Sequence, residues 1–189
     1  MKFSVDNYFK SHLEIFNKID ISSIENALDI VGKKFDNGFK IFTCGNGGSA
    51  HNASHFITDW NKFITLKNNK LFKGISLCDN IGIITAYAND INYESIFKGQ
   101  LSSLLEKDDL LICISGSGNS KNVIEAAKFA NKIGADVLSL LGFDGGVLLN
   151  ISKYKVHVPS FDMQICEDIH LMIGHMIMKK LSNIDINEK

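Results

Sequence analysis

The sequence contains no arginine, and all 20 of its basic residues are lysines. Guanidinium groups make the bidentate contacts to phosphates and to base edges, so their absence argues against that mode of recognition. A net charge of −1, without a lysine cluster on one predicted face, gives no support for nucleic acid as a partner. A phosphate bound by this chain is therefore expected to be held by backbone N–H groups, hydroxyls, helix ends or lysines.

The sequence also lacks a long apolar run, since no stretch approaches the roughly 20 residues that a membrane-spanning helix needs. The first residues, MKFSVDNYFKSHLEIF, form an amphipathic pattern and not the apolar core of a signal peptide. We therefore expect a cytoplasmic protein that does not bind membranes. With 189 residues, 45% of them apolar and 22% charged, we expect one globular domain over residues 1–189.

Cysteine is scarce, and the four cysteines are far apart in the sequence. They are Cys44, Cys78, Cys113 and Cys166, of which three lie at or near the ends of apolar runs. This spacing favours buried, reduced thiols over disulfides or a thiolate zinc site.

Short apolar runs alternate with helical patterns along the middle of the chain. Four runs cover residues 39–45, 73–79, 109–115 and 135–142, and a fifth candidate covers residues 153–159. Strands that alternate with helices indicate βαβ units. The core, residues 38–160, is therefore predicted to be a three-layer α/β structure, an open sheet of about five mostly parallel strands flanked by helices.

Helices are predicted on both sides of this core. In residues 1–37 we expect helices over 4–18 and 22–36, the second opened by Ser22 and Ser23 with Glu25 in its first turn. Residues 161–182 form a long helix whose apolar stripe either covers a subunit interface or completes the core. The tail, residues 183–189, is polar and is expected to fray.

Two glycine- and serine-rich turns follow predicted strands. The first, within TCGNGGSAH, runs from Cys44 to Ser49, and the second, SGSGNS, runs from Ser115 to Ser120. Ligands of open α/β sheets bind where strands run into helix N-termini, and such termini attract anions. One such turn alone is more often a tight connection. Two of them at different strand ends favour a site for a phosphate monoester.

Neither turn matches a nucleotide-binding motif. No Gly-Lys-Ser/Thr triplet is present, and neither loop fits GxGxxG with an acidic residue at the next strand end. The sequence therefore disfavours binding of nucleoside triphosphates and dinucleotides.

Candidate acids, bases and metal ligands follow the first turn. His51, His55 and Asp59 are four residues apart and share one helix face, which begins at the anion site. A lone histidine on a helix is more often a surface or hydrogen-bonded core residue than a catalytic group or a metal ligand. A histidine and a carboxylate one helical turn apart, beside a loop that can bind phosphate, are stronger evidence for a functional site.

A second set of titratable residues lies on the closing helix: Glu167, Asp168, His170 and His175. Glu167 and His175 are eight residues apart, about 12 Å along a helix and roughly 80° around it. They can converge on one site only if the helix bends or another subunit contributes. His175, among isoleucines and methionines, fits a core histidine equally well.

The motifs CGNGGSAHNASHF and SGSGNSKNVIEAA, followed by a late EDIH…GH, resemble the SIS (sugar isomerase) domain and specifically the phosphoheptose isomerases. The resemblance covers nearly the whole chain, including ANDINYESIF at 88–97. It implies a flavodoxin-like fold and homotetramers with active sites at subunit interfaces, some of which bind zinc. It also implies conversion of sedoheptulose 7-phosphate to D-glycero-D-manno-heptose 7-phosphate, the first step toward the heptose of bacterial lipopolysaccharide or capsule.

The resemblance implies roles for individual residues. Substrate would be bound by Asn46, Gly47, Gly48, Ser49, Asp90, Ser115, Gly116, Ser117, Asn119, Ser120 and Glu167, with the phosphate among the three serines of the second turn. Zinc would be bound by His55, Asp59, Glu167 and His175. Carbonyl migration through an enediol needs a base and an acid, and we assign Asp59 as the base and His175 as its partner.

The chain departs from the family pattern at two of these positions. The family commonly has Glu at the position of Asp59 and Gln at that of Glu167, and Asn61, Lys62 and Phe63 replace a common Gly-Arg. These differences leave open an isomerase of another ketose phosphate. They also leave open a non-catalytic SIS tetramer that binds a partner protein, such as the kind that assists the initiator of bacterial replication. The two histidines and two carboxylates favour the enzyme.

Overall fold

Five strands form one parallel sheet in the computed structural model, which describes residues 3–186. In the order along the sheet these are β2 (Gly74–Ser76), β1 (Ile41–Cys44), β3 (Leu110–Ser115), β4 (Asp136–Leu141) and β5 (Tyr154–His157), and every recorded pair is parallel. The predicted α/β class is confirmed, and the sheet is wholly parallel within the described residues. Strand order reverses between β1 and β3, so β1 leads to β2 on one side and β3 leads to β4 on the other.

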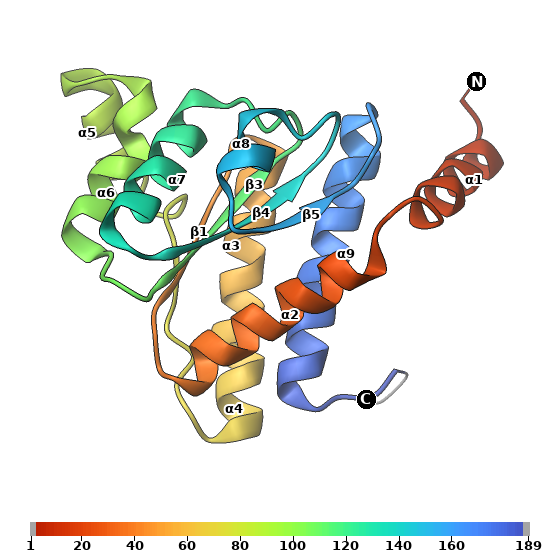
Figure 1. Ribbon diagram of the computed structural model, residues 1–189, viewed down its shortest axis with the longest axis horizontal. Coiled ribbons are helices and arrows are strands. Elements are labelled where there is room, and N and C mark those ends of the chain that lie inside the picture. The colour runs from red at the N-terminus through yellow and green to blue at the C-terminus, as the bar shows by residue number, and fades with distance from the viewer. Residues whose placement is uncertain (1–2, 187–189) are drawn as a thin grey trace.

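Alternating side chains on the strands build a core on each face of the sheet. On β3, Ile112 and Ile114 contribute to one buried cluster, while Leu111 and Cys113 contribute to the other. The first cluster is covered by α2 (Ile21–Asp36), α3 (Gly48–Asp59) and α9 (Met163–Ser182). The second is covered by α6 (Ile96–Leu104), α7 (Lys121–Ile133) and α8 (Gly146–Ile151), with α5 (Ile81–Asp90) beyond α6 (Figure 1).

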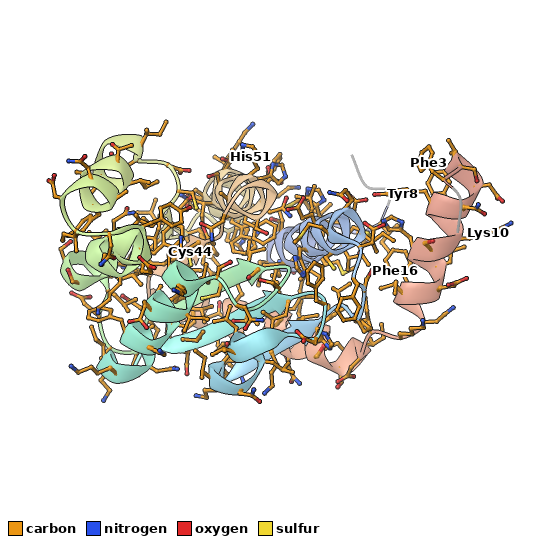
Figure 2. The ribbon with its side chains drawn as sticks, turned by 90° about the horizontal axis from the view of Figure 1, so that it is seen from above. Phe3, Tyr8, Lys10, Phe16, Cys44 and His51 are labelled. Atoms are coloured by element: carbon orange, nitrogen blue, oxygen red, sulfur yellow. The ribbon has the colours of Figure 1, made fainter. Side chains whose placement is uncertain are left out.

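Helix α1 (Val5–Phe16) lies at the end of the molecule, beyond α9 (Figure 1). Tyr8 and Phe16 point from α1 toward the rest of the chain and pack on the first core cluster, whereas Lys10 points away (Figure 2). Phe9 and Leu13 on the same helix remain 65% and 61% exposed. An apolar helix face is therefore left without a partner in the single chain.

The predicted helix boundaries are close to those observed, but the predicted opening of α2 is wrong. Asp20 caps this helix, and its carboxylate accepts bonds from the Ser22 N–H at 3.0 Å and the Ser22 hydroxyl at 2.7 Å. The cap must lie before the first helical residue in an extended conformation, which Asp20 adopts and Ser22, already inside the helix, does not. Of the predicted fraying tail, residues 187–189 lie outside the described part of the chain.

All four cysteines are free thiols, as predicted, and three of them are buried. Cys44 and Cys113 are opposite each other on β1 and β3, with 4.0 Å between their sulfur atoms. The neighbouring Cys113 thiol and burial raise the pKa of Cys44 well above its usual value, so Cys44 is a poor source of nucleophilic thiolate. In the described chain, no helix combines the length and the apolar character that crossing a bilayer requires.

His170 is the fully buried histidine of α9. Burial lowers the pKa of His170 to about 4, against a smaller opposing influence of the Leu141 backbone. The unfolded chain, with an ordinary histidine pKa near 6.5, therefore binds this proton at a higher pH than the folded chain does.

The free energy of unfolding should accordingly fall as the pH drops from about 6.5 to about 4, by roughly 3 kcal/mol from this one group. In His170→Leu, the difference between the unfolding free energies at pH 7.5 and pH 4.5 should shrink by about 2–3 kcal/mol. Urea titrations at the two pH values measure this, with the exposed His51→Gln as control. An unchanged pH difference in His170→Leu would show that His170 does not couple protons to folding.

Candidate active site

A cavity of about 300 Å³ opens between the loops that follow β1 and β3, where strand order reverses. Parallel β1 and β3 end side by side there, with Cys44 opposite Cys113. The cavity is lined by Asn46, Gly47, Gly48, Ser49, Ile114, Ser115, Gly116, Ser117, Ser120, Met163 and Glu167. The crevice at such a switch point is the usual ligand site of this sheet topology.

The first loop needs its glycines for different reasons. Gly47 lies immediately before α3 with φ of 55°, a conformation that residues with a Cβ rarely adopt. A Cβ added to Gly48 would overlap the Glu167 carboxylate, so this glycine allows the closing helix to approach the loop. The turn that reads as a tight connection is therefore also the wall of the cavity.

Internal hydrogen bonds hold the second loop in shape. The hydroxyl of Ser115 accepts a bond from the Gly118 N–H at 3.1 Å, and that of Ser117 accepts one from the Asn119 N–H at 3.2 Å. The Asn119 side chain accepts a bond from the Val147 N–H at 3.0 Å. Asn119 therefore links the loop to α8 instead of lining the cavity.

Helices α3 and α7, which follow the two loops of the cavity, have no side-chain caps. Neither Gly47, before α3, nor Ser120, before α7, caps its helix with a side chain, whereas α1, α2, α5 and α9 begin with side-chain caps. Backbone N–H groups at uncapped N-termini, together with the positive ends of the helix dipoles, favour an anion. The Ser120 hydroxyl lines the cavity and is an additional donor.

Asp90 lies apart from this cavity. It is exposed at the end of α5 and accepts a bond from the Asn89 side chain at 2.8 Å. Of the eleven residues predicted to bind substrate, Asp90 and Asn119 are the two that do not line the cavity.

His55, Asp59 and His175 form a second group at the contact between α3 and α9. The Nε2 atoms of His55 and His175 are 3.0 Å apart, and Oδ2 of Asp59 lies 3.3 Å from the first and 3.9 Å from the second. One ligand atom from each residue lies within 4.8 Å of the other two. Two imidazole nitrogens and a carboxylate oxygen suit Zn²⁺ or a similar divalent ion.

Close packing of α3 against α9 assembles this group. The indole Nε1 of Trp60 donates a bond to the carbonyl of Gly174 at 3.0 Å, directly before His175. A Cβ added to Gly174 would overlap the ring of Phe56. A π-helical turn, Trp60–Ile64, follows Asp59, as is common at functional sites.

The predicted metal set is not brought together in full by one chain. Glu167 lies outside the group of His55, Asp59 and His175 formed by the described residues, and it lines the cavity instead. The sequence allowed His175 to be a core histidine, but its side chain is partly exposed. The buried histidine of α9 is His170. His51 shares the helix face but is exposed outside the group (Figure 2).

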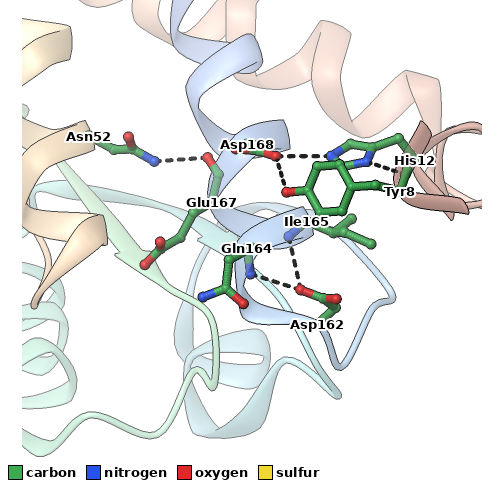
Figure 3. Close-up of polar contacts among 8 residues, drawn as sticks. All are labelled: Tyr8, His12, Asn52, Asp162, Gln164, Ile165, Glu167 and Asp168. Carbon is green, nitrogen blue, oxygen red and sulfur yellow. Dashed lines mark hydrogen bonds and ion pairs between the residues drawn. The ribbon is translucent and has the colours of Figure 1, made fainter. Parts of the chain in front are cut away.

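A hydrogen-bonded cluster beside Glu167 joins α1 to α9 (Figure 3). Asp168 Oδ2 accepts a bond from the Tyr8 hydroxyl at 2.6 Å and lies 3.1 Å from His12 Nε2. The Asp168 carboxylate raises the pKa of Tyr8 to about 12. Sequence reasoning missed this cluster because Asp168 is about 160 residues from Tyr8 and His12. The four-residue spacing of Tyr8 and His12 on one helix was the available signal.

An apolar hollow of about 460 Å³ adjoins His175. It lies between α1 and α9 and is lined by Tyr8, Phe9, His12, Phe16, Asp168, Leu171, Met172 and His175. The group of His55, Asp59 and His175 therefore borders the unpartnered apolar face of α1.

Comparison with known proteins relates this chain to one family of sugar-phosphate proteins. The family model described as "SIS domain" matches residues 7–142. The phosphoheptose isomerase of Aliarcobacter butzleri is 36% identical over 186 residues, 97% of this chain and 98% of that protein. That of Clostridium acetobutylicum is 35% identical over 182 residues, 94% and 92% of the two chains.

Two solved structures share the whole fold. The phosphoheptose isomerase of Neisseria gonorrhoeae superimposes with a TM-score of 0.86 at 29% identity, covering 95% of this chain and 97% of the other. That of Francisella tularensis gives 0.87 at 28% identity, covering 95% and 96%.

Gly174→Ala should force α9 away from Phe56 and so separate His175 from His55. We expect a loss of about 1–3 kcal/mol in unfolding free energy from overpacking and at least a ~10-fold loss in affinity for Zn²⁺. Urea unfolding and calorimetric Zn²⁺ titration measure the two effects.

Gly32→Ala on α2 is the matched control, because a Cβ there meets only the end of the Leu181 side chain. It should retain wild-type Zn²⁺ affinity. If Gly174→Ala also retained it, the packing of α3 on α9 would not set the geometry of the group.

Proposed function

Because this chain belongs to the SIS domain family and, within it, to the phosphoheptose isomerases, we infer that it is an aldose-ketose isomerase of a sugar phosphate. The substrate that fits this membership is sedoheptulose 7-phosphate, converted to D-glycero-D-manno-heptose 7-phosphate. The observation that carries the inference is the cavity between two uncapped helix N-termini, on the chain that also assembles His55, Asp59 and His175.

The cavity supplies binding and orientation. Backbone N–H groups of the second loop and the hydroxyls of Ser117 and Ser120 hold the phosphate without arginine. A phosphate anchored at a distance from the reacting carbons fixes their position, and this binding energy contributes to the chemical step. Ser49 and Asn46, on the other wall, face the sugar.

Proton transfer is assigned to Asp59 and His175. The Asp59 carboxylate takes the proton from the carbon next to the carbonyl, an enediol forms, and the proton returns to the neighbouring carbon. His175 moves the proton between the two oxygens. Oδ2 of Asp59 lies 3.9 Å from His175 Nε2, so the pair can serve one substrate.

We propose that His55, Asp59 and His175 hold Zn²⁺, with Glu167 added from another subunit. A bound divalent ion supplies Lewis-acid polarisation of the substrate oxygens. The donor set fits this ion, because imidazole and carboxylate are its ordinary ligands in proteins.

A different ketose phosphate is the second candidate. The carboxylate of Glu167 lines the cavity and lies against Gly48. At the position of Glu167 the family commonly has glutamine. A carboxylate accepts hydrogen bonds but cannot donate them, so the hydroxyl pattern preferred by this pocket can differ from that of the family.

Asp59→Asn should preserve the fold and lower kcat for sedoheptulose 7-phosphate by at least about 100-fold, since the amide cannot act as a base. NMR detection of the aldose product, with chelated and Zn²⁺-reloaded protein, measures this. The surface variant Asp29→Asn on α2 should keep wild-type kcat. Full turnover by Asp59→Asn would overturn the base assignment, and an inactive wild type that is still stabilised by the ketose phosphate would favour another substrate.

We propose that the chain assembles as a homotetramer with its active sites at subunit interfaces. Glu167 and His175 are separated by two turns of α9, about 12 Å along its axis, so one chain cannot close a site around both. The exposed Phe9 and Leu13, beside the hollow that contains His175, supply apolar surface for a second copy.

Light scattering should therefore give about four times the chain mass of 21.0 kDa. Leu13→Asp should yield smaller species with a wild-type circular dichroism spectrum and little activity. Lys132→Glu, at an exposed position of α7 on the other side of the sheet from α1, should stay tetrameric. A monomeric and fully active wild type would contradict the interface site.

Four free thiols suit a reducing compartment, and we place the reaction in the cytoplasm. We treat residues 1–189 as a single SIS domain, supported by the packing of α2 and α9 on the same sheet face.

A further inference from the structure

Three separate segments meet at the side-chain amide of Asn46, on the wall of the cavity. Asn46 belongs to the loop after β1, Asn122 to the first turn of α7, and Tyr93 to the short 3₁₀ helix η2 (Tyr93–Ser95). Oδ1 of Asn46 accepts bonds from the Tyr93 hydroxyl at 2.9 Å and from Asn122 Nδ2 at 2.8 Å. Nδ2 of Asn46 donates to Asn122 Oδ1 at 2.9 Å.

The backbone fixes the orientation of both amides. The Val123 N–H, which can only donate, lies 3.0 Å from one end of the Asn122 amide, so this end must be the oxygen. The Asn46 atom that faces the same oxygen must then be nitrogen. Asn122 is only 2% exposed, so water does not compete readily for this arrangement.

Counting donors and acceptors leaves one free group on Asn46. Both lone pairs of Oδ1 are occupied, by Tyr93 and Asn122, and one of the two N–H bonds of Nδ2 is used by Asn122. The second N–H remains for the cavity that Asn46 lines. Asn46 can therefore donate to a ligand but cannot accept from one.

We propose that Tyr93 and Asn122 are positioning residues that fix Asn46 as a hydrogen-bond donor, so that this wall of the cavity recognises an acceptor oxygen of the substrate. This step rests on the proposed isomerase function. A carbonyl oxygen, and more so the enediolate oxygen that develops from it, is such an acceptor, whereas a hydroxyl that has to donate is not matched. A donor fixed before the ligand arrives loses little entropy on binding and favours the charged intermediate.

Tyr93 offers a clean test because its ring is largely exposed, so removing the hydroxyl should leave the fold intact. Tyr93→Phe frees one lone pair of Asn46 and lets the amide turn over. We expect kcat/KM for sedoheptulose 7-phosphate to fall about 3- to 10-fold, the usual effect of one neutral hydrogen bond. In an Asn46→Ala background, the same substitution should change kcat/KM by less than about 2-fold.

The double-mutant cycle separates positioning from direct contact. Equal reductions by Tyr93→Phe in both backgrounds would mean that Tyr93 does not act through Asn46, and the proposal would fail. Tyr87→Phe is the matched control, because this tyrosine packs on α6 against Gly99, away from the amide pair, and the variant should keep wild-type kcat/KM.

A spectroscopic measurement tests the proposal even if the substrate is wrong. The Asn46 Nδ2 signals are identified in ¹H–¹⁵N spectra by their loss in Asn46→Ala. They should shift in Tyr93→Phe and stay in place in Tyr87→Phe. Unshifted signals in Tyr93→Phe would overturn the positioning role, whereas shifted signals with no turnover of any heptose phosphate would overturn only the isomerase function.

Discussion

The adjacency of parallel β1 and β3 is the constraint on which the site depends. The chain leaves these strands toward opposite faces, because α3 belongs to the layer with α2 and α9, and α7 belongs to the layer with α6 and α8. The two helices therefore diverge, and a crevice opens between their N-termini. A protein without arginine can hold a phosphate there, because the fold itself supplies the donors and the favourable dipoles.

A second constraint is the close contact of α3 with α9. At Gly174 the two helices approach until the Phe56 ring occupies the space of a side chain, and the Trp60 indole bonds to the Gly174 carbonyl. Asp59 is one methylene shorter than the glutamate common in the family, yet its carboxylate stays within 3.9 Å of His175 Nε2. The close packing of α3 on α9 at Gly174 therefore fits the shorter side chain of Asp59 in this chain.

The sequence supported the strands, the two loops and the face shared by His55 and Asp59, because each depends on local periodicity and turn chemistry. It did not support the choice between His170 and His175 as the core histidine. Both lie on an apolar helix, and only the packing of α9 on the sheet buries one and leaves the other beside the hollow. Nor could spacing show that Asn119 holds α8 while Ser120 lines the cavity, since both belong to the same short loop.

The sequence by itself determined the fold class and the composition of the two glycine- and serine-rich loops, and it supplied the histidines and carboxylates to which we assign the chemistry. These follow from patterns that span at most a few turns of helix or one strand. Only the tertiary structure decided which groups meet. It placed Glu167 in the cavity between the two loops rather than with the two histidines, joined Asp168 to Tyr8, and locked the Asn46 amide between two segments. Such contacts join residues far apart in the chain, and distances of about 3 Å are set by helix packing that no local pattern specifies.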